Sequence, residues 1–503
     1  MTVAADSQMA TPSLGRFLVQ LIWGRWFMMF GALLIMAGAG GTYLFGVYSQ
    51  EIKATFGYDQ STLNLMGTFK DLGANVGVLS GLIAEVTPVW FVLLLGSLMN
   101  FTGYFMIWLS LTGKIAKPKV WQMCLYICIG ANSQNFANTG SLVTCVKNFP
   151  ESRGMMLGLL KGYVGLSGAV FTQLYHAIYG DDAKSLVLLI GWFPGAISLI
   201  FIFIMRIMKV GRRHPREVTV FYYYLYISIG LALSAMALTI AQKGLRFSHV
   251  AYILSATLVC FWLFLPLVIA MKEEYIDWKT VKHPNDSAKN IESNEQATKE
   301  TGDPKDDKEK KVTCFMDICD KPTRGEDYTI LQALLSADMI ILFVATLCGL
   351  GCSLTAVDNM GQIGLALGYP ARTISTFVSL ISIWNYFGRV FAGFGSEILL
   401  TKYKIPRPLI MSIALFLSSI GDILIAFPFN GSVYLASLLI GFAFGAQLTL
   451  LFTIISELFG LKTRKFYKGD IYKKFRDQSP ENKIEMGVTE YSEGEKSCNQ
   501  QRL

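Results

Sequence analysis

Amide and hydroxyl side chains crowd one stretch of the chain that is otherwise apolar enough to lie in a membrane. The string GANSQNFANTGS, residues 130–141, stands inside an apolar run from about residue 121 to 146, which has the length of a membrane span. On a helix, the polar side chains that share about half of the circumference are Asn132, Gln134, Asn135, Asn138 and Thr139. An amide that faces hydrocarbon without a partner costs several kcal/mol. These residues therefore either line a cavity that binds a polar solute or hold neighbouring helices together by hydrogen bonds.

The next apolar segment carries a lysine on a face of small residues. In RGMMLGLLKGYVGLSGA, Lys161 shares one helical stripe with Gly154, Gly158, Gly165 and Gly168. Small residues let a neighbouring backbone approach closely, so we expect this stripe to face another helix and not lipid. An intramembrane lysine costs roughly 2.5–3.5 kcal/mol and is a candidate for substrate binding. The alternative is a lysine that snorkels to the inner headgroups.

Three further candidates lie in the first two apolar segments. Lys70 and Asp71 stand about half-way along GTFKDLGANVG, and Tyr43 offers a hydroxyl in GAGGTYLFGVYSQ. If Lys70 faces the same cavity as Lys161, the two cations favour an anionic substrate, organic or inorganic. Asp71 is then either a proton-coupling carboxylate or the partner of Lys70. The glycines beside Tyr43 are expected to pack, because no strand precedes them to make a dinucleotide site.

Charged residues also occur in the later apolar segments. Asp358 is predicted near the outer end of its helix and Arg389 near the cytosolic end of the next one. We interpret Arg389 as a gating or structural residue that bonds Glu397 or a backbone carbonyl. Asp358 is a further candidate for coupling or gating.

Motifs of enzymes and metal sites do not appear. There is no nucleophile elbow, P-loop, zincin motif or paired catalytic carboxylate set, so the sequence does not predict an enzyme. The 9 Cys fall mostly in apolar segments and the 4 His are scattered, which gives no metal site, and no cofactor is expected. The net charge of +8 comes from Lys and Arg in particular loops, as the positive-inside rule predicts, and not from a nucleic-acid-binding patch.

Composition indicates the fold class that must position these residues. The chain is 52% hydrophobic and only 16% charged, whereas soluble domains carry about 25% charge. Apolar runs of about 20 residues recur between short polar stretches, which is typical of a helical membrane protein. The predicted spans are 26–48, 64–84, 89–111, 121–146, 155–178, 186–208, 219–241, 248–271, 338–360, 373–395, 406–427 and 433–458.

The distribution of Lys and Arg places both termini in the cytosol. Low hydrophobicity and mixed charge predict a disordered linker between the eighth and ninth spans. The predicted parts are a cytosolic N-terminus over 1–25, a six-helix bundle over 26–208, two extra helices over 219–271, a disordered cytosolic loop over 272–337, a partial C-terminal bundle over 338–458 and a cytosolic tail over 459–503.

An internal repeat bridges the predicted linker. FGYDQSTLN at 56–64 matches LGYPARTIS at 367–375, and GLIAE at 81–85 matches GFGSE at 393–397 at nearly the same offset. Duplicated halves are a feature of secondary transporters. The repeat aligns the ninth span with the first, so the seventh and eighth spans are an insertion. The arrangement is all-α, with about 12 transmembrane helices as 6 + 2 + 4.

Longer strings resemble a known family. GTYLFGVYSQEIKATFGYDQSTLN, GLIAEVTPVW, GANSQNFANTGSLVTCVKNFPESRGMMLGLLKG and GLSGAVFTQLY are similar to the plant nodulin-like proteins of the major facilitator superfamily, including the nuclear fusion defective group. The resemblance implies a secondary transporter with two six-helix bundles and alternating access. It also implies that Glu85 and Glu397, with Gly81 and Gly393, form degenerate copies of a gating loop motif. The basic cluster that follows this motif in the superfamily is absent here.

The chain departs from that family near its end. In relatives, a string like SELFGLK precedes two further helices, and here it abuts TRKFYKGDIYKKFR at Lys462–Thr463. This pattern predicts an internal deletion of two helices and poor transport by this chain.

The sequence as a whole predicts a secondary active transporter of a small polar solute that works by alternating access, in the plasma membrane or an endomembrane. The alternative is a non-transporting or regulatory truncated form. A small-molecule substrate and membrane lipids are the expected partners, with proton coupling through a carboxylate and with no nucleic acid.

Overall fold

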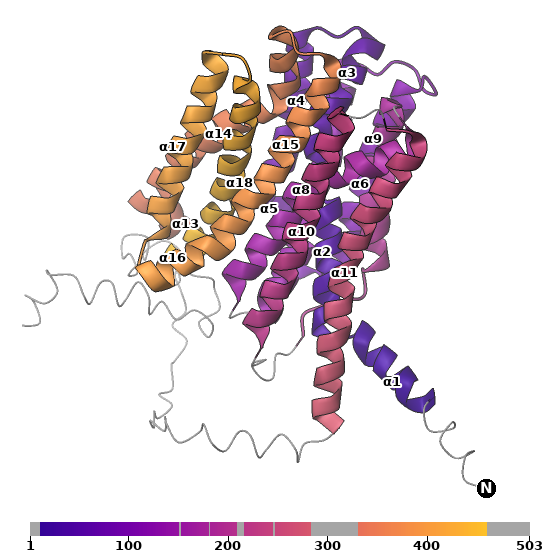
Figure 1. The fold of residues 1–503 in the computed structure, drawn as a ribbon, viewed down its shortest axis with the longest axis vertical. Coiled ribbons are helices and arrows are strands. Elements are labelled where there is room, and N and C mark those ends of the chain that lie inside the picture. The colour runs from indigo at the N-terminus through magenta and orange to yellow at the C-terminus, as the bar shows by residue number, and fades with distance from the viewer. Residues whose placement is uncertain are drawn as a thin grey trace, which may run out of the picture. The chain divides into compact units, whose positions relative to one another are not determined.

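A computed structural model describes residues 11–149, 152–180, 182–208, 216–244, 247–282 and 330–459, and the regular elements in these ranges are helices (Figure 1). The chain divides into two compact units. The first unit comprises residues 1–301 and 348–450, and it holds every site discussed below. The second comprises 302–347 and 451–503; its described parts are the short helix α13 (Ile330–Leu334) and one end each of α14 and α18.

The helices before the predicted linker are α1 (Thr11–Ile22), α2 (Arg25–Gly38), η1 (Gly41–Leu44), α3 (Phe45–Phe56), α4 (Gln60–Asn75), α5 (Val78–Val86), α6 (Val89–Leu111), α7 (Val120–Asn148), α8 (Arg153–Tyr179), α9 (Ala183–Ile200), α10 (Glu217–Gly244) and α11 (His249–Lys282). Those after it, besides α13, are α14 (Ala337–Ala366), α15 (Ala371–Val390), η2 (Phe391–Gly395), α16 (Ser396–Tyr403), α17 (Arg407–Ala426) and α18 (Ser432–Leu458).

The all-α membrane fold class is confirmed. Among the described residues, nine helical segments are long and apolar enough to cross a membrane. The other three predicted spans are also helical but differ from an ordinary span. The second predicted span is broken into α4 and α5. The fourth corresponds to α7, which carries the amide-rich stretch, and the sixth corresponds to α9, which has only 18 residues.

The first predicted span is interrupted in its middle. It consists of α2, the 3-10 segment η1 and α3 in direct succession, with a run of glycines at the break. A Cβ atom at Gly40 would lie 1.6 Å from Ser167 Oγ of α8, so only glycine permits this approach. The break turns the short segment η1 toward α8.

The glycine stripe of α8 packs against α15 and η2, which together form the tenth predicted span. A Cβ atom at Gly158 would lie 2.7 Å from Gly393 Cα, and one at Gly165 would lie 3.0 Å from Tyr386 N. This contact brings the backbones of two helices together across the predicted linker. It is the direct result of the small-residue pattern read from the sequence.

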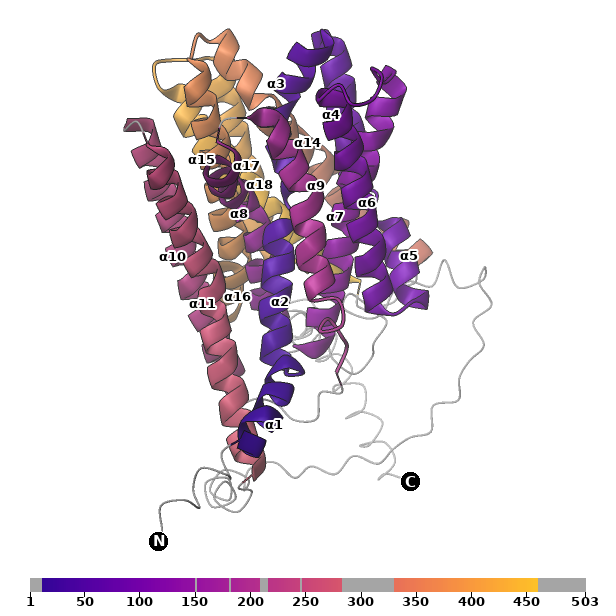
Figure 2. The ribbon, with the colours of Figure 1, turned by 90° about the vertical axis from the view of Figure 1, so that its right-hand side faces the viewer.

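The two inserted helices run side by side, as Figure 2 shows for α10 and α11. Ion pairs at one end connect them to neighbouring segments, with Arg25 Nη1 3.3 Å from Glu217 Oε2 and Arg216 Nη2 2.8 Å from Glu273 Oε2.

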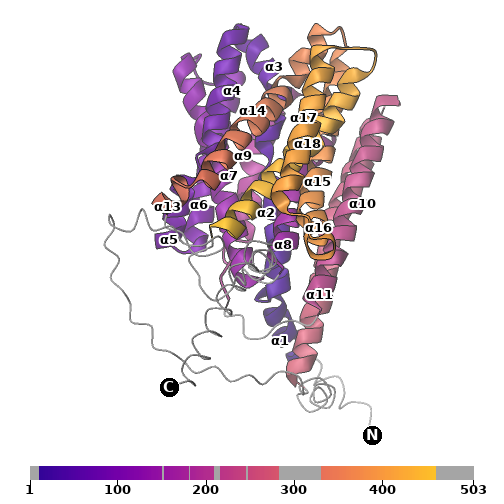
Figure 3. The same cartoon turned by 90° about the vertical axis from the view of Figure 1, so that its left-hand side faces the viewer.

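α11 continues to Lys282, so the prediction that a disordered loop begins at residue 272 was wrong. The rest of that predicted loop, residues 283–329, lies outside the described residues. Figure 3 shows α17 beside α18, where Gly421 contacts Ile440.

Candidate functional site

A buried arginine joins three helical elements of the first unit. The Arg389 side chain donates from Nε to Asn385 Oδ1 at 2.7 Å, from Nη1 to the Lys161 carbonyl at 2.8 Å and from Nη2 to the Tyr43 hydroxyl at 2.8 Å. Arg389 is only 1% exposed. Of the two partners expected for this arginine, the structure shows a carbonyl and not Glu397. We call Arg389, Lys161 and Tyr43 the central cluster.

Local sequence features place each member of the central cluster. Tyr43 lies in η1, at the break of the first span. Lys161 lies on the glycine face of α8, which packs on α15. Arg389 stands at the end of α15, directly before the π-helical segment η2. π-Helical turns widen a helix locally and are frequent at functional sites.

The central cluster concentrates positive charge. Two basic residues meet here, because Arg389 bonds the backbone carbonyl of Lys161. The three hydrogen bonds of Arg389 use three of the five N–H donors that a guanidinium carries. Among the described residues, no carboxylate lies within salt-bridge distance of Arg389. Phe444 of α18 packs edge-on against Tyr43, with ring centroids 6.2 Å apart.

A second charged group, the ion triad, consists of Lys70, Asp71 and Asp358. Lys70 Nζ lies 2.6 Å from both Oδ atoms of Asp358 and 2.8 Å from Asp71 Oδ1. Lys70 is 2% exposed and also lies 5.2 Å from the centroid of the Phe45 ring. Lys70 is therefore held by carboxylates here, in contrast to the expectation that it faces a substrate together with Lys161.

The amides of α7 have mostly structural partners in this conformation. Asn132 Nδ2 donates to the carbonyls of Gly73 and Val76, both at 2.9 Å, and Asn135 Nδ2 donates to the Gly73 carbonyl at 3.0 Å. These carbonyls lie at the break between α4 and α5 and lack partners within the helix. Asn132 and Asn135 close this break, which agrees with the second of the two roles that the sequence left open, and their role as ligands of a substrate stays a prediction.

Two of the three other polar residues of that face, Thr139 and Asn138, differ from each other. Thr139 Oγ1 shares a hydrogen bond of 2.9 Å with Ser80 Oγ of α5. Asn138 Oδ1 is buried without a hydrogen-bond partner among the described residues. The hydrogen bonds of Asn132, Asn135 and Thr139 go to α4, α5 and the break between them, whereas Arg389 bonds α8 and η1. The structure thus separates two groups that the sequence analysis assigned to one site.

Replacing Asn132 and Asn135 together by alanine is expected to lower stability without affecting ligand binding. Three hydrogen bonds are lost, each worth about 0.6 kcal/mol in a membrane protein, or roughly 2 kcal/mol in all. Thermal unfolding in detergent measures the change, with Asn64→Ala on an exposed part of α4 as the control. A double variant that melts like the wild type but no longer responds to a ligand would show that these amides bind the ligand and do not stabilise the fold.

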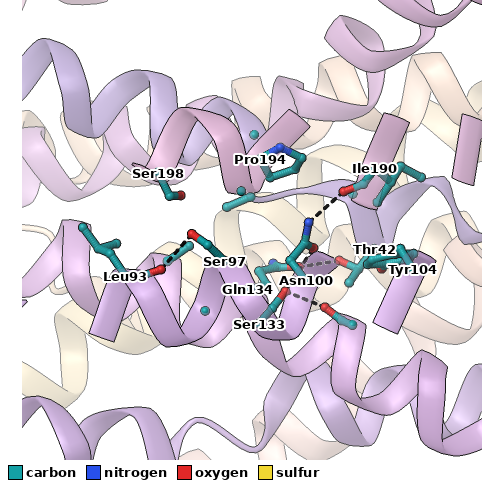
Figure 4. A pocket seen from close by; sticks show the side chains of 17 residues that line it. Thr42, Leu93, Ser97, Asn100, Tyr104, Ser133, Gln134, Ile190, Pro194 and Ser198 are labelled. Atoms are coloured by element: carbon teal, nitrogen blue, oxygen red, sulfur yellow. Dashed lines mark hydrogen bonds between the residues drawn. The ribbon is translucent and has the colours of Figure 1, made fainter. Parts of the chain in front are cut away.

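A small cavity with several polar side chains in its wall lies between α2, η1, α6, α7 and α9 (Figure 4). Its volume is about 30 Å³, enough for roughly one or two water molecules and too small for most solutes. Asn100 Nδ2 donates to the carbonyls of Ile190 and Gly191, both at 2.8 Å, and Thr42 Oγ1 donates to Gln134 Oε1 at 2.5 Å. Sequence analysis missed Asn100, a single amide in an apolar helix, although an intramembrane amide is itself a signal.

The two copies of the predicted gating motif behave differently. Glu397 pairs with Arg407 of α17, and Arg407 Nη1 donates to Ser396 Oγ at 3.0 Å. Glu85 is exposed at the end of α5, and no ion pair involves it among the described residues. Only the second copy therefore makes an ionic contact between helices in this conformation.

Comparison with known proteins agrees with the helical membrane architecture. The Nodulin-like family model matches residues 25–271, from α2 to within α11. The Arabidopsis thaliana Protein NUCLEAR FUSION DEFECTIVE 4 is 22% identical over 462 residues, which are 87% of this chain and 75% of the relative. The Uncharacterized membrane protein YMR155W of Saccharomyces cerevisiae is 22% identical over 184 residues, which are 36% of this chain and 32% of the relative. These similarities and the apolar helices indicate an integral, multi-pass membrane protein of a transporter type.

Proposed function

We propose that this chain, whose residues 25–271 match the Nodulin-like family model, is a secondary active transporter of a small organic or inorganic anion. The observation that carries the proposal is the central cluster. Arg389 is buried where it bonds the backbone carbonyl of Lys161, and no carboxylate among the described residues neutralises it by a salt bridge. A bound anion would offset this buried positive charge and accept the remaining N–H bonds of the guanidinium.

The central cluster also suits alternating access. Tyr43 and Lys161 come from the first predicted half, whereas Arg389 and the neighbouring Phe444 come from the second. A ligand that contacts both halves stabilises the conformations in which they meet around it. Binding sites between repeats near the middle of the membrane are the rule in transporters of this architecture.

A thermal-shift screen on the detergent-purified protein tests the proposal. The probes are inorganic anions, mono- and dicarboxylates and, as controls, neutral polyols. A ligand at a hundredfold excess over its dissociation constant stabilises the folded state by about 2.7 kcal/mol. We expect an anion to raise the melting temperature of the wild type but not of Lys161→Gln, with no response to the polyols.

The matched control is Lys184→Gln. Lys184 is a half-exposed lysine that lies 3.7 Å from Glu51 at the start of α9. This variant should keep the full anion response. A wild type that melts cooperatively and responds to no anion, or a Lys161→Gln variant that responds as strongly as the wild type, would contradict the proposed site.

A further inference from the structure

The first helix, α1, carries apolar side chains on its packed face and on its exposed face. On the packed face, the Phe17 ring lies edge-on to two rings of α11, with centroids 5.7 Å from Tyr275 and 5.8 Å from Trp278. A second set of apolar side chains, at the end of α1 and directly after it, is 44–59% exposed: Leu18, Val19, Ile22 and Trp23. A helix that is apolar on both faces is typical of a membrane environment and not of water.

A bend between α1 and α2 keeps α1 near the level at which α2 begins. The backbone N–H of Trp26, at the start of α2, donates to Glu274 Oε1 of α11 at 2.8 Å, so these two residues lie at one level. If α1 continued along the axis of α2, Phe17 would lie nine residues, or about 13 Å, beyond that level. Instead Phe17 contacts Tyr275 and Trp278, which are at most four residues, or about 6 Å, past Glu274. Figure 2 shows α1 beside this end of α11.

Sequence and contacts indicate that this level is the boundary between membrane and water. The long apolar run of α11 ends at Met271 and is followed by KEEYIDWK at 272–279. Lys272 Nζ lies 5.7 Å from the centroid of the Tyr223 ring on α10. Basic residues beside tyrosine and tryptophan are typical of the headgroup layer. The exposed face of α1 is therefore continuous with the lipid-facing surface of the spans.

Arg206 stands beside the exposed face of α1. Its Nη2 donates to the Trp23 carbonyl at 2.7 Å, and its guanidinium lies 4.2 Å from the centroid of the Trp23 ring. Asn148, at the end of α7, fixes the backbone on either side: its Nδ2 donates to the Arg206 carbonyl at 2.9 Å, and its Oδ1 accepts from Met208 N at 2.8 Å. Within the described ranges, no carboxylate lies within salt-bridge distance of Arg206. Four of the five N–H donors of its guanidinium thus remain for a phosphate.

We propose that α1 is an interfacial helix that lies in the headgroup layer of the cytosolic leaflet, where Arg206 binds the phosphate of an anionic phospholipid. The exposed apolar side chains of α1 then contact acyl chains, as in other interfacial helices. In the orientation that the sequence predicts, this end of the bundle faces the cytosolic leaflet, whose surface is negatively charged. The inference goes beyond the proposed function, because it does not depend on which solute is transported.

Spin-label accessibility tests the position of α1 in the full chain. Single labels are attached through non-natural amino acids at Val19 on α1, at Phe261 within the apolar run of α11, and at Ala116 in the loop between α6 and α7. Val19 and Phe261 are equally exposed, at 59%, and Ala116 is exposed as well. In lipid nanodiscs, oxygen concentrates in the acyl chains and a nickel chelate stays in water. We expect oxygen to relax the Val19 label more strongly than nickel does, as at Phe261 and opposite to Ala116. A Val19 label that behaves like the one at Ala116, or one shielded from both reagents by protein, would overturn the inference.

Thermal unfolding in nanodiscs tests the lipid site. We expect the wild type to melt at a higher temperature in phosphatidylcholine mixed with phosphatidylserine than in phosphatidylcholine alone, because a bound lipid stabilises the folded state. Arg206→Gln should lose most of this rise. The matched control, Lys402→Gln, should keep it, since Lys402 also lies over an aromatic ring, 5.5 Å from the Tyr403 centroid, but on α16.

Further arms separate this site from general charge attraction. Arg206→Lys, which keeps the charge but not the planar fork, should keep part of the rise, and it serves if Arg206→Gln does not fold. Inorganic phosphate added to phosphatidylcholine discs should not reproduce the effect of the lipid. Equal rises in the wild type and Arg206→Gln, equal losses in Arg206→Gln and Lys402→Gln, or a full effect of free phosphate would each overturn the lipid site.

Discussion

Arg389→Leu is expected to unfold at a much lower temperature than the wild type. The leucine removes the three hydrogen bonds that Arg389 donates to the Asn385 amide oxygen, the Lys161 carbonyl and the Tyr43 hydroxyl. Buried acceptors that lose a charged donor cost about 1–3 kcal/mol each, so the total loss is about 3 kcal/mol or more. Thermal unfolding of the detergent-purified protein, followed by helical circular dichroism, measures it.

Arg389→Lys separates charge from geometry. Lysine keeps the positive charge, but its single ammonium group cannot reach three acceptors on three elements as the planar guanidinium does. We expect a melting temperature between those of the wild type and Arg389→Leu. If Arg389→Leu melts like the wild type, the three acceptors have other donors and the central cluster is not a structural junction of the helices.

Periodic patterns predicted the part of this fold that depends on helix faces. The glycines of α8 recur at helical spacing, and the structure packs them against α15. The same spacing placed Lys161 on that face, next to Arg389. A helix face can be read from one segment alone, because the residues that form it lie three or four positions apart. The family resemblance was likewise readable from the sequence, and the family match confirms it.

Breaks in helices and distant partners were harder to predict. The predicted second span is broken after Asn75, and the amides of Asn132 and Asn135 bond the carbonyls exposed there. The sequence placed these amides on a face that meets other helices or a cavity. It could not distinguish the two, because the helix contact exists only where the break between α4 and α5 exposes carbonyls. The junction at Lys462–Thr463 lies outside the described residues, so the predicted deletion stays a prediction.

Pairing within the ion triad also depends on distant positions. Lys70 and Asp358 are 288 residues apart, and no local pattern connects them. A usable signal existed, because an intramembrane cation and an intramembrane carboxylate on different helices are candidates for each other. Applying it would have required knowing which helices meet, which the repeat alone does not give.

Lys70→Met is expected to destabilise the protein strongly and in a pH-dependent way. Removing one partner of a buried ion pair costs about 3–5 kcal/mol, because the other charge is left without compensation. In this variant Asp71 and Asp358 both lose their cation. The folded state then favours protonated carboxylates more than the unfolded state does, so its stability falls as pH rises. Melting temperatures at mildly acidic and at alkaline pH measure both effects.

Two comparisons decide whether this loss comes from the unpaired charges. Lys70→Met combined with Asp358→Leu removes one of the carboxylates and should recover part of the stability at alkaline pH. Lys184→Met removes a lysine from the more exposed pair with Glu51, whose atoms lie 3.7 Å apart, and should cost about 1 kcal/mol or less. Equal losses for Lys70→Met and Lys184→Met would mean that the triad is solvated in the membrane-embedded protein. It would then be a poor link between α4 and α14, because a solvated carboxylate exchanges its partner for water at little cost.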